Sequence, residues 1–392
     1  DEYWIIPHFE KTLYDNALLL TAYSQAYAKS KNYYFKEKAD GIFNYVKKTL
    51  LSKKGFYSGQ DADSEGKEGK FYVFSFEEIK NVVDNFDLFS KYFDITKEGN
   101  FEGRNILHTH PEIKLTQEEK NKIERDKEKL LKYRNKRINP GIDAKIITSW
   151  NSLMISGFAI YGNLCNNDEA IKISEEILNS ILKSCLNENK LLRIHGKNNL
   201  IGFVEDYSFL INSLLDLYEI TFKNNYLERA KELTKVTLEL FYKNGFSNAS
   251  KFSEKLFIQF SDMEDNVIPS GISIMVLSLF RLNEVIHNEE YDKIIEKELK
   301  INMGKMNNHP LNCQILLQTL YSKIKSFYSI EINGDKKFIY SVHNSLIRVP
   351  IFNKIIYEGA KKENIIQICH KNTCQMFKTV EEARNFLESQ IS

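Results

Sequence analysis

The stretch TSWNSLMISGFAIYGNLCNNDEAIKISEEILNSILKSC, residues 148–185, decides the fold class of this 392-residue chain. Its first half repeats large or apolar side chains at i, i+3, i+4, i+7, i+8 and i+11 from Trp150 onward, and its second half carries a similar stripe from Ala170 onward. Each half therefore has one apolar face at the period of an α-helix. The polar pair Asn166-Asn167 between them is typical of a short turn. The stretch predicts a hairpin of two helices, over residues 147–163 and 168–185.

The same helical period recurs on both sides of this hairpin. A second hairpin is predicted over 205–222 and 226–243, with a short polar turn at residues 223–225. Four of the six prolines fall at or just before a predicted helix start, where a missing N–H costs nothing. Tandem hairpins with short turns at one end and long loops at the other predict a closed or open helical array. Further long helices fit residues 10–29, 33–51, 117–136, 270–287, 290–304 and 310–325.

The pattern changes near residue 327. Three short segments, 327–332, 337–342 and 365–369, alternate like strands, and residues 380–387 read as a last helix. We therefore predict two parts, a helical array over residues 1–326 and a small α/β segment over residues 327–392 that packs on it.

Composition and charge exclude several classes of protein. The 54 basic and 53 acidic side chains leave a net charge of +1, so nothing attracts the whole chain to nucleic acid or acidic lipid. No apolar run approaches the ~20 residues of a membrane helix, and the first residues lack the layout of a signal peptide. We expect a cytoplasmic protein with no nucleic-acid partner, no membrane contact and no cofactor.

The five cysteines are odd in number and scattered, which does not suit a disulfide framework. Most of them are expected to be small buried fillers. Four residues separate Cys369 from Cys374, and His370 lies beside the first, so a metal or redox role stays open for this pair.

An acidic loop at residues 58–66 is the first candidate for chemistry, because Asp61, Asp63 and Glu65 lie within five residues. The spacing matches the first half of a calcium loop, but the twelfth position is Tyr72 where a bidentate Glu is needed, so we predict no metal here. The loop is either a solvated acidic turn or a site where neighbouring charges raise the pKa of an acid or base. Asp61 and Asp63 are therefore catalytic candidates.

The start of the first predicted helix is the second candidate. Glu10 lies in a first turn, where the helix dipole favours a carboxylate, and His8 can equally be a structural histidine. Asp15 lies near the apolar stripe of this helix, where a carboxylate is usually paired or functional. We take all three as candidates for substrate binding.

Polar residues recur at the starts of alternate helices. Two interpretations stay open for Trp150 and Asn151. Trp150 can be a core residue that follows a plain N-cap at Ser149, or it can be a stacking platform for a sugar ring, with the Asn151 amide as a donor to sugar hydroxyls. If alternate helices form an inner ring, their starts meet at one mouth, and we predict a polar cleft there. A similar polar start comes before the helix at 270–287, where Asp262 precedes Ser270. The further catalytic candidates are Asp143, Glu205 and Asp206, and the further substrate-binding candidates are Trp150, Asn151, Tyr207 and Ser270.

Five motifs, in this order, resemble the YyaL-like family, which includes the spermatogenesis-associated thioredoxin-domain proteins. They are Ile6-Pro7-His8-Phe9-Glu10-Lys11, Asp61-Ala62-Asp63-Ser64-Glu65-Gly66, Thr148-Ser149-Trp150-Asn151, Glu205-Asp206-Tyr207 and Pro269-Ser270-Gly271. The resemblance spans nearly the whole chain, although the family usually has Asn where this chain has Ile272. It implies an all-α-dominated (α/α)6 toroid similar to the six-hairpin glycosidases and the N-acylglucosamine 2-epimerases. It also implies a preceding thioredoxin-like domain that is absent here, so we expect a fragment or a processed product.

Two functions follow from these features. Carboxylates and Trp150-Asn151 at one mouth predict a carbohydrate-binding or carbohydrate-active toroid, whose partner is a small sugar or sugar derivative. A glycosidase would place two carboxylates ~5–9 Å apart, whereas an epimerase would need bases such as histidines facing the sugar carbon. The alternative is a non-catalytic module that docks a thioredoxin-like redox domain or another protein. The histidine candidates are His8, His108, His110, His195 and His309.

Overall fold

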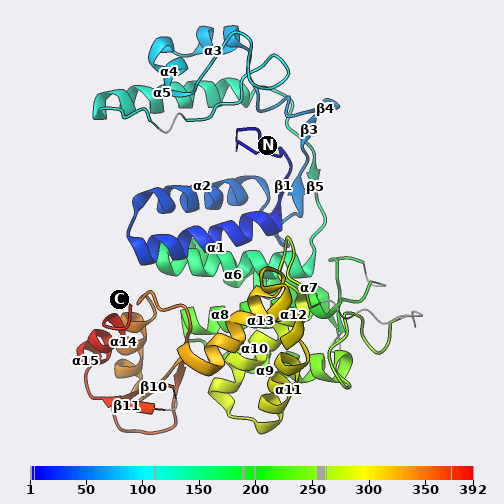
Figure 1. Cartoon of the computed structure of the whole chain (residues 1–392), viewed down its shortest axis with the longest axis vertical. Coiled ribbons are helices and arrows are strands. Elements are labelled where there is room, and N and C mark those ends of the chain that lie inside the picture. Colours follow the sequence, from blue (N-terminus) through cyan, green and yellow to red (C-terminus); the bar gives the residue numbers. More distant parts are fainter. Residues whose placement is uncertain are drawn as a thin grey trace. The chain divides into compact units, whose positions relative to one another are not determined.

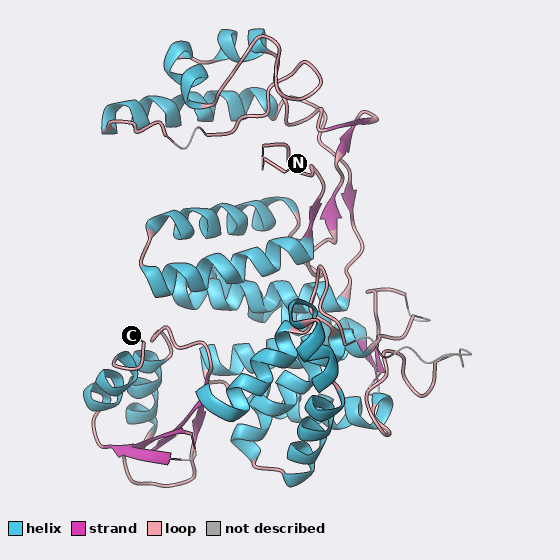
Figure 2. Ribbon diagram, in the orientation of Figure 1, coloured by secondary structure: helices cyan, strands magenta, loops and turns pink. Residues whose placement is uncertain are grey.

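The computed structural model describes every residue except 1, 4, 110–111, 188–189, 198–199, 254–260, 262, 372 and 392. The described chain divides into two compact units, and helices make up much more of it than the mostly short strands do (Figure 2). The first unit is residues 1–12 with 59–144, and the second is residues 13–58 with 145–392. The boundary predicted near residue 327 falls inside the second unit. None of the described helices is long and apolar enough to cross a membrane.

The second unit is built from successive helical hairpins (Figure 1). They are α1 (Leu13–Ser30) with α2 (Tyr33–Thr49), α6 (Thr148–Cys165) with α7 (Asp168–Cys185), α8 (Val204–Thr221) with α9 (Asn224–Phe241), and α10 (Gly271–Ile286) with α11 (Glu289–Ile301). A short strand pair, β6 (Leu186–Asn187) and β7 (Lys190–Leu191), follows α7. The chain continues through α12 (Met303–Asn308), a 3₁₀ turn (Pro310–Asn312), α13 (Gln314–Tyr321) and a π-helical turn (Ser322–Ser326). The tandem hairpins predicted from the sequence period are confirmed.

The hairpin of α6 and α7 shows how local sequence forms these elements. Helix α6 ends at Cys165, and the C-cap residue Asn166 adopts the left-handed conformation with φ 59°. The side chain of Asn167 caps α7 by accepting from the Ala170 amide. One face of α7 is buried at helical spacing, whereas α6 is buried nearly all round. A helix that is apolar on every side belongs inside, so α6 is an inner helix and α7 an outer one.

The inner helices pack in chain order, α1 on α6, α6 on α8, α8 on α10, and α10 on α13. One cavity is lined by residues from all five of these helices. Helices that follow one another around a shared cavity form a toroid, and the predicted fold class is therefore confirmed for the described part of the second unit.

A small α/β segment ends the second unit. Its elements are β8 (Tyr328–Asn333), α14 (Lys336–Leu346), β9 (Lys354–Glu358), β10 (Ile365–His370), β11 (Thr373–Phe377) and α15 (Val380–Glu388). The sheet order is β11-β10-β8-β9, with β8 and β9 parallel and the other pairs antiparallel. Cys369 and Cys374 face each other across β10 and β11 and form a disulfide. Cys165, Cys185 and Cys313 are free and buried, as expected for fillers.

The strand predicted over 337–342 is wrong, because these residues belong to helix α14. Asp335 caps the helix by accepting from the Phe338 amide at 2.9 Å. Ile339, Val342 and Leu346 are buried at a spacing of three and four residues, which matches a helix. Six residues are too few to separate the two periods, so the cap and the burial decide the element.

The first unit combines a ribbon of short strands with three helices. The three-stranded sheet is β1 (Lys11–Thr12), β2 (Gly59–Gln60) and β5 (Ile142–Asp143), and a hairpin joins β3 (Asp63–Ser64) to β4 (Lys67–Glu68). The helices are α3 (Phe76–Val82), α4 (Phe86–Tyr92) and α5 (Gln117–Arg134). They share a core of their own, which includes Phe74, Ile79, Phe89, Ile123 and Leu130. The sequence predicted α5 but neither this core nor α3 and α4.

Candidate functional site

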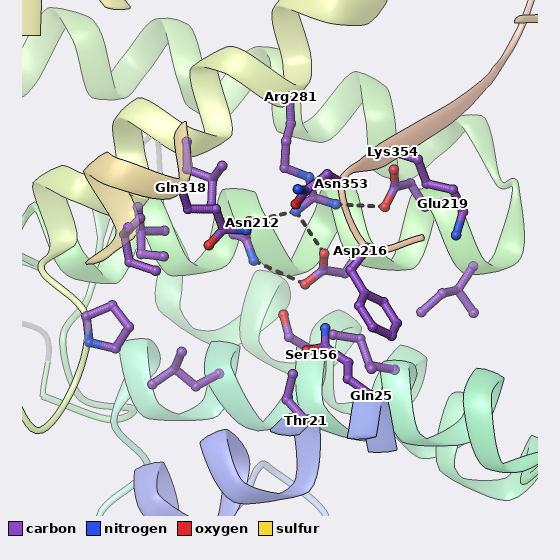
Figure 3. A pocket seen from close by; sticks show the side chains of 18 of the residues that line it. Thr21, Gln25, Ser156, Asn212, Asp216, Glu219, Arg281, Gln318, Asn353 and Lys354 are labelled. Carbon is purple, nitrogen blue, oxygen red and sulfur yellow. Dashed lines mark hydrogen bonds and ion pairs between the residues drawn. The ribbon is translucent and has the colours of Figure 1, made fainter. Parts of the chain in front are cut away.

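A cavity of about 340 Å³ lies among the inner helices of the second unit (Figure 3). Its wall comes from α1, α6, α8, α10 and α13 and from the segment that leads into β9. The volume falls in the range of roughly 300–1,000 Å³ that is typical of small-molecule sites. The polar side chains in the wall are Thr21, Gln25, Ser156, Asn163, Asn212, Asp216, Glu219, Arg281, Gln318, Ser322, Asn353 and Lys354. We call this space the toroid cavity.

Arg281 organises the charges of the toroid cavity. Its Nη1 lies 2.8 Å from Asp216 Oδ1 and donates to Asn212 Oδ1 at 2.7 Å, and its Nη2 lies 2.8 Å from Glu219 Oε2. Asn212, Asp216 and Glu219 follow one another at four and three residues on α8, so the helix places them on one face. Asn212 also donates to Asp216 Oδ2 at 3.1 Å. Both oxygens of Asp216 are thus engaged.

Glu219 differs from Asp216 because its second oxygen is not engaged. Oε1 is buried and has no hydrogen-bond partner among the described residues. Burial raises the pKa of Glu219 to about 6, against the opposing effect of the Arg281 charge. A buried carboxyl with one available oxygen and a pKa near neutrality can accept a hydrogen bond from a ligand or exchange a proton with it.

The C-terminal segment contributes Lys354 to the cavity wall. Lys354 Nζ donates to the carbonyls of Val349 at 2.8 Å and Ile351 at 2.7 Å, so it holds its own loop in place. Burial lowers the pKa of Lys354 to about 8, although the nearby Glu219 opposes this shift. His343 of α14 contacts the Glu219 carbonyl through Nε2 at 2.6 Å. The α/β segment is therefore tied to the end of α8.

None of the twelve residues predicted as site residues lines the toroid cavity. The starts of α6 and α8 do meet, since the fully buried Asp206 accepts from the Ser149 amide at 3.0 Å and the Phe203 amide at 2.9 Å. Arg193 pairs with Glu205 at 2.6 Å and with Asp206 at 3.3 Å. Burial raises the pKa of Asp206 to about 7, and the Arg193 charge opposes the shift. These groups form a closed network at the opposite end of α8 from Glu219.

The other candidates of the second unit make packing and capping contacts. The buried Asn151 accepts from the Phe56 amide at 2.7 Å and donates to its carbonyl at 3.0 Å. Trp150 packs edge to face on Tyr14, with ring centroids 4.7 Å apart. Ser270 is the N-cap of α10. Any further role for these side chains stays a prediction.

Tyr207 and Asp15 complete the candidates of the second unit. Tyr207 is fully buried, and its hydroxyl accepts from the Leu191 amide at 2.7 Å. Asp15 is exposed on α1. Among the histidines, His110 lies outside the described residues, as does Asp262, and no histidine appears in the wall of the toroid cavity as described.

The five candidates of the first unit lie on or near its strand ribbon. Asp143 pairs with Gly59 across β5 and β2, and the Asp61 amide donates to the Gly141 carbonyl at 2.8 Å. All five are exposed, namely His8, Glu10, Asp61, Asp63 and Asp143. No group of three or more His, Cys, Asp or Glu side chains in the described part of the chain could hold a metal ion. Their predicted roles stay untested by these contacts.

Sequence reasoning missed the charged residues of the toroid cavity, although a signal was present. Arg281 lies within the apolar helix α10, and Asp216 and Glu219 interrupt the apolar run of α8. Charged side chains inside an apolar helix are rarely buried without partners. Matching such charges between two inner helices would have pointed to this cavity.

Comparison with curated proteins gives several relatives, two of which match this chain at similar identity. The chain is 28% identical to human spermatogenesis-associated protein 20 over 86% of this chain and 50% of that protein. It is 29% identical to an uncharacterised protein of Caenorhabditis elegans over 79% of this chain and 49% of that protein. The chain thus spans about half the length of the curated relatives it matches. No family model matches it.

The solved structures that align with this chain are more distant in sequence than these relatives. A cellobiose 2-epimerase from Spirochaeta thermophila aligns with a TM-score of 0.48 at 11% identity, over 78% of this chain and 62% of that chain. A GH76 α-mannanase from Bacteroides thetaiotaomicron aligns with a TM-score of 0.47 at 10% identity, over 97% and 86%. A sugar epimerase from a ruminal bacterium aligns with a TM-score of 0.46 at 14% identity, over 76% and 60%.

Proposed function

We propose that the second unit binds a small sugar or sugar derivative in the toroid cavity and that Glu219 transfers a proton to or from it. The observation that carries the proposal is the Oε1 atom of Glu219, which is buried at a polar cavity without a hydrogen-bond partner among the described residues. A buried polar atom left without a partner costs free energy that a bound hydroxyl would offset.

The surrounding residues have separable roles in this proposal. Arg281 holds Asp216 and Glu219 in place through its two terminal nitrogens. With a pKa of about 6, Glu219 is available in both protonation states near neutral pH. Gln25, Asn163 and Gln318 come from three different helices and bring amide donors and acceptors to the wall. Such amides suit a ligand with many hydroxyl groups.

The carboxylate arrangement favours proton transfer over glycoside hydrolysis. Hydrolysis needs two carboxyl groups that both reach the substrate, but Asp216 is engaged through both oxygens by Arg281 and Asn212. Glu219 alone has an available oxygen among the carboxyl groups of the described wall. We therefore propose proton transfer at the carbon next to the carbonyl of a reducing sugar, as in isomerisation or epimerisation.

Proton exchange with solvent tests this function directly. The protein is incubated in D₂O with glucose, mannose, cellobiose or N-acetylglucosamine, and loss of the C2 proton signal is followed by NMR. Exchange is expected for at least one sugar, and Glu219→Gln should slow it about 10²–10⁴-fold, the usual contribution of a general acid or base. Glu363→Gln, an exposed glutamate of the same unit, is the matched control and should leave the rate unchanged.

The docking module predicted as the alternative gives a different result. It requires that no sugar stabilises the protein in a thermal-shift assay, whereas an isolated thioredoxin-like domain binds measurably, because a ligand of the native state raises its apparent stability. Absence of both exchange and stabilisation with every sugar would rule out the proposed function.

A further inference from the structure

The first unit contains a second cavity, of about 320 Å³, which shares no lining residue with the toroid cavity. It is lined by Pro7, His8, Phe9, Lys11, Tyr72, Phe74, Ile106, Leu107 and Arg134. Of the site residues predicted from the sequence, His8 lies in its wall. This wall holds two cationic side chains, three aromatic rings and no carboxylate. We call it the basic cavity.

Lys11 is the first cation of the basic cavity. Its Nζ lies 3.6 Å from the centroid of the Tyr72 ring and donates to the Phe9 carbonyl at 2.9 Å. Burial, and then the charge of Arg134, lowers the pKa of Lys11 to about 8. No carboxylate of the described chain forms an ion pair with this ammonium group. Its charge is therefore only partly compensated, by a ring face and one carbonyl.

Arg134, the last residue of α5, is the second cation. Its guanidinium lies 5.5 Å from the Tyr72 centroid and 5.0 Å from that of Phe71. Its Nε is buried and has no hydrogen-bond partner among the described residues. Burial lowers the pKa of Arg134 as well. The structure thus brings two partly buried positive charges together without a counter-charge in the described chain.

Neighbouring basic residues of the same unit behave differently. Arg137 pairs with Glu78 at 3.0 Å, and Lys70 pairs with Glu65 at 2.8 Å. This unit thus contains carboxylates that pair with basic residues, but among the described residues none forms an ion pair with Lys11 or Arg134. Two like charges that are partly removed from water raise the free energy of the folded state. An anion bound between them would offset that cost.

We propose that the basic cavity binds a phosphate monoester with an apolar or aromatic ester group. Lys11 and Arg134 hold the phosphate, since a guanidinium offers planar paired donors and an ammonium a compact charge. Phe9, Tyr72 and Phe74 form the apolar wall for the ester group, and Phe9 stacks on Tyr72 with centroids 5.8 Å apart. The site belongs to the first unit alone and does not depend on the function proposed for the toroid cavity.

Calorimetric titration with small anions at constant ionic strength tests this site. Phenyl phosphate is expected to bind more tightly than inorganic phosphate, and benzoate should bind more weakly than phenyl phosphate. Lys11→Met and Arg134→Met should each weaken phenyl phosphate binding about tenfold or more, because each removes a charged hydrogen-bond donor. Lys132→Met removes an exposed charge from the same helix and is expected to leave the affinity unchanged. Arg134→Lys keeps the charge and should lose less affinity than Arg134→Met.

The affinity should also depend on pH in a defined direction. The titratable groups of the wall are His8, Lys11, Tyr72 and Arg134. Burial raises the pKa of Tyr72, and a phosphate monoester has its second pKa near ~6. Between pH 7 and 9 the main change is therefore loss of the Lys11 proton, so the affinity of the wild type falls over this range and that of Lys11→Met does not. Failure of phenyl phosphate to bind, equal binding of benzoate, equal losses in Lys132→Met and Lys11→Met, or a pH-independent wild type would each overturn the proposal.

Discussion

Glu219 is the residue whose surroundings differ most from those of an ordinary glutamate. Its unshifted pKa is 4.5, and burial raises it to about 6 in the folded protein. Between these two values the folded chain binds more protons than the unfolded chain, so the free energy of unfolding falls as the pH rises. A side chain that does not titrate at this position would remove this pH dependence of the free energy of unfolding.

We therefore predict that Glu219→Gln changes how the free energy of unfolding depends on pH. From pH 4.5 to 6, the free energy of unfolding of the wild type should fall relative to that of the variant, and above pH 7 the difference should be constant. Urea denaturation at a series of pH values measures both curves. Parallel curves over the whole range would mean that Glu219 ionises normally.

Single residues also show why the site residues predicted from the sequence do not line the toroid cavity. The sequence predicts Trp150, Asn151 and Asp206 as site residues because polar residues at helix starts suit a binding site. The structure uses Asn151 to bind the Phe56 backbone and Asp206 to cap the start of α6. A polar side chain at a helix start looks the same in the local sequence whether it caps a helix or binds a ligand. Only the groups that surround it in the folded protein distinguish the two roles.

Helices α8 and α10 approach closely at their starts, and a glycine makes this possible. A Cβ added to Gly271 would lie 2.5 Å from the Cα of Glu205 and 2.7 Å from its Cβ. Since backbone atoms cannot yield as a flexible side chain can, Gly271→Ala should force the two helices apart. We expect a loss of about 1–3 kcal/mol in the free energy of unfolding, the usual cost of overpacking.

Gly41 on α2 is the matched control for this substitution. A Cβ there would meet nothing within 4 Å, so Gly41→Ala should keep or raise the stability, by up to about 1 kcal/mol, because alanine favours a helix. Chemical denaturation compares the two variants. Equal stability changes would contradict the tight approach of α8 and α10.

Across the whole chain, the two units have separate hydrophobic cores. In the first unit the buried Asp126 of α5 accepts from the amides of Asp84 and Asn85 at 2.9 and 3.0 Å and so anchors the start of α4. Asp126→Ala leaves these donors without an acceptor and should cost about 1–3 kcal/mol. Glu128→Ala, exposed on the same helix, should cost nothing measurable.

Calorimetry shows whether this loss stays within one unit. We expect more than one thermal transition, since separate cores need not unfold together. Only one transition should move in Asp126→Ala. A single transition that shifts as a whole would show that the two cores unfold cooperatively.

The long helices of the second unit and their hairpin order follow from the sequence by itself. The residues that determine them, such as the stripe that begins at Ala170 and the turn at Asn166-Asn167, act within one or two helical turns. The same local reasoning failed at 337–342, where a six-residue segment fits either period, and it did not indicate that residues 59–144 form part of a separate unit with its own core.

The tertiary structure alone decided which charged residues share a cavity. Arg281, Asp216 and Glu219 come from two different helices, and so do not form a local motif. Lys11 and Arg134 are likewise far apart in the chain and meet only when the first unit folds. The burial and the ion pairs of a charged side chain depend on which other segments of the chain lie beside it. They determine its pKa and whether it has a polar atom left to contact a ligand. The sequence by itself determined the helical hairpins because helices and turns form through interactions between residues close in the chain. The two cavities depend on contacts between segments that are distant in the chain.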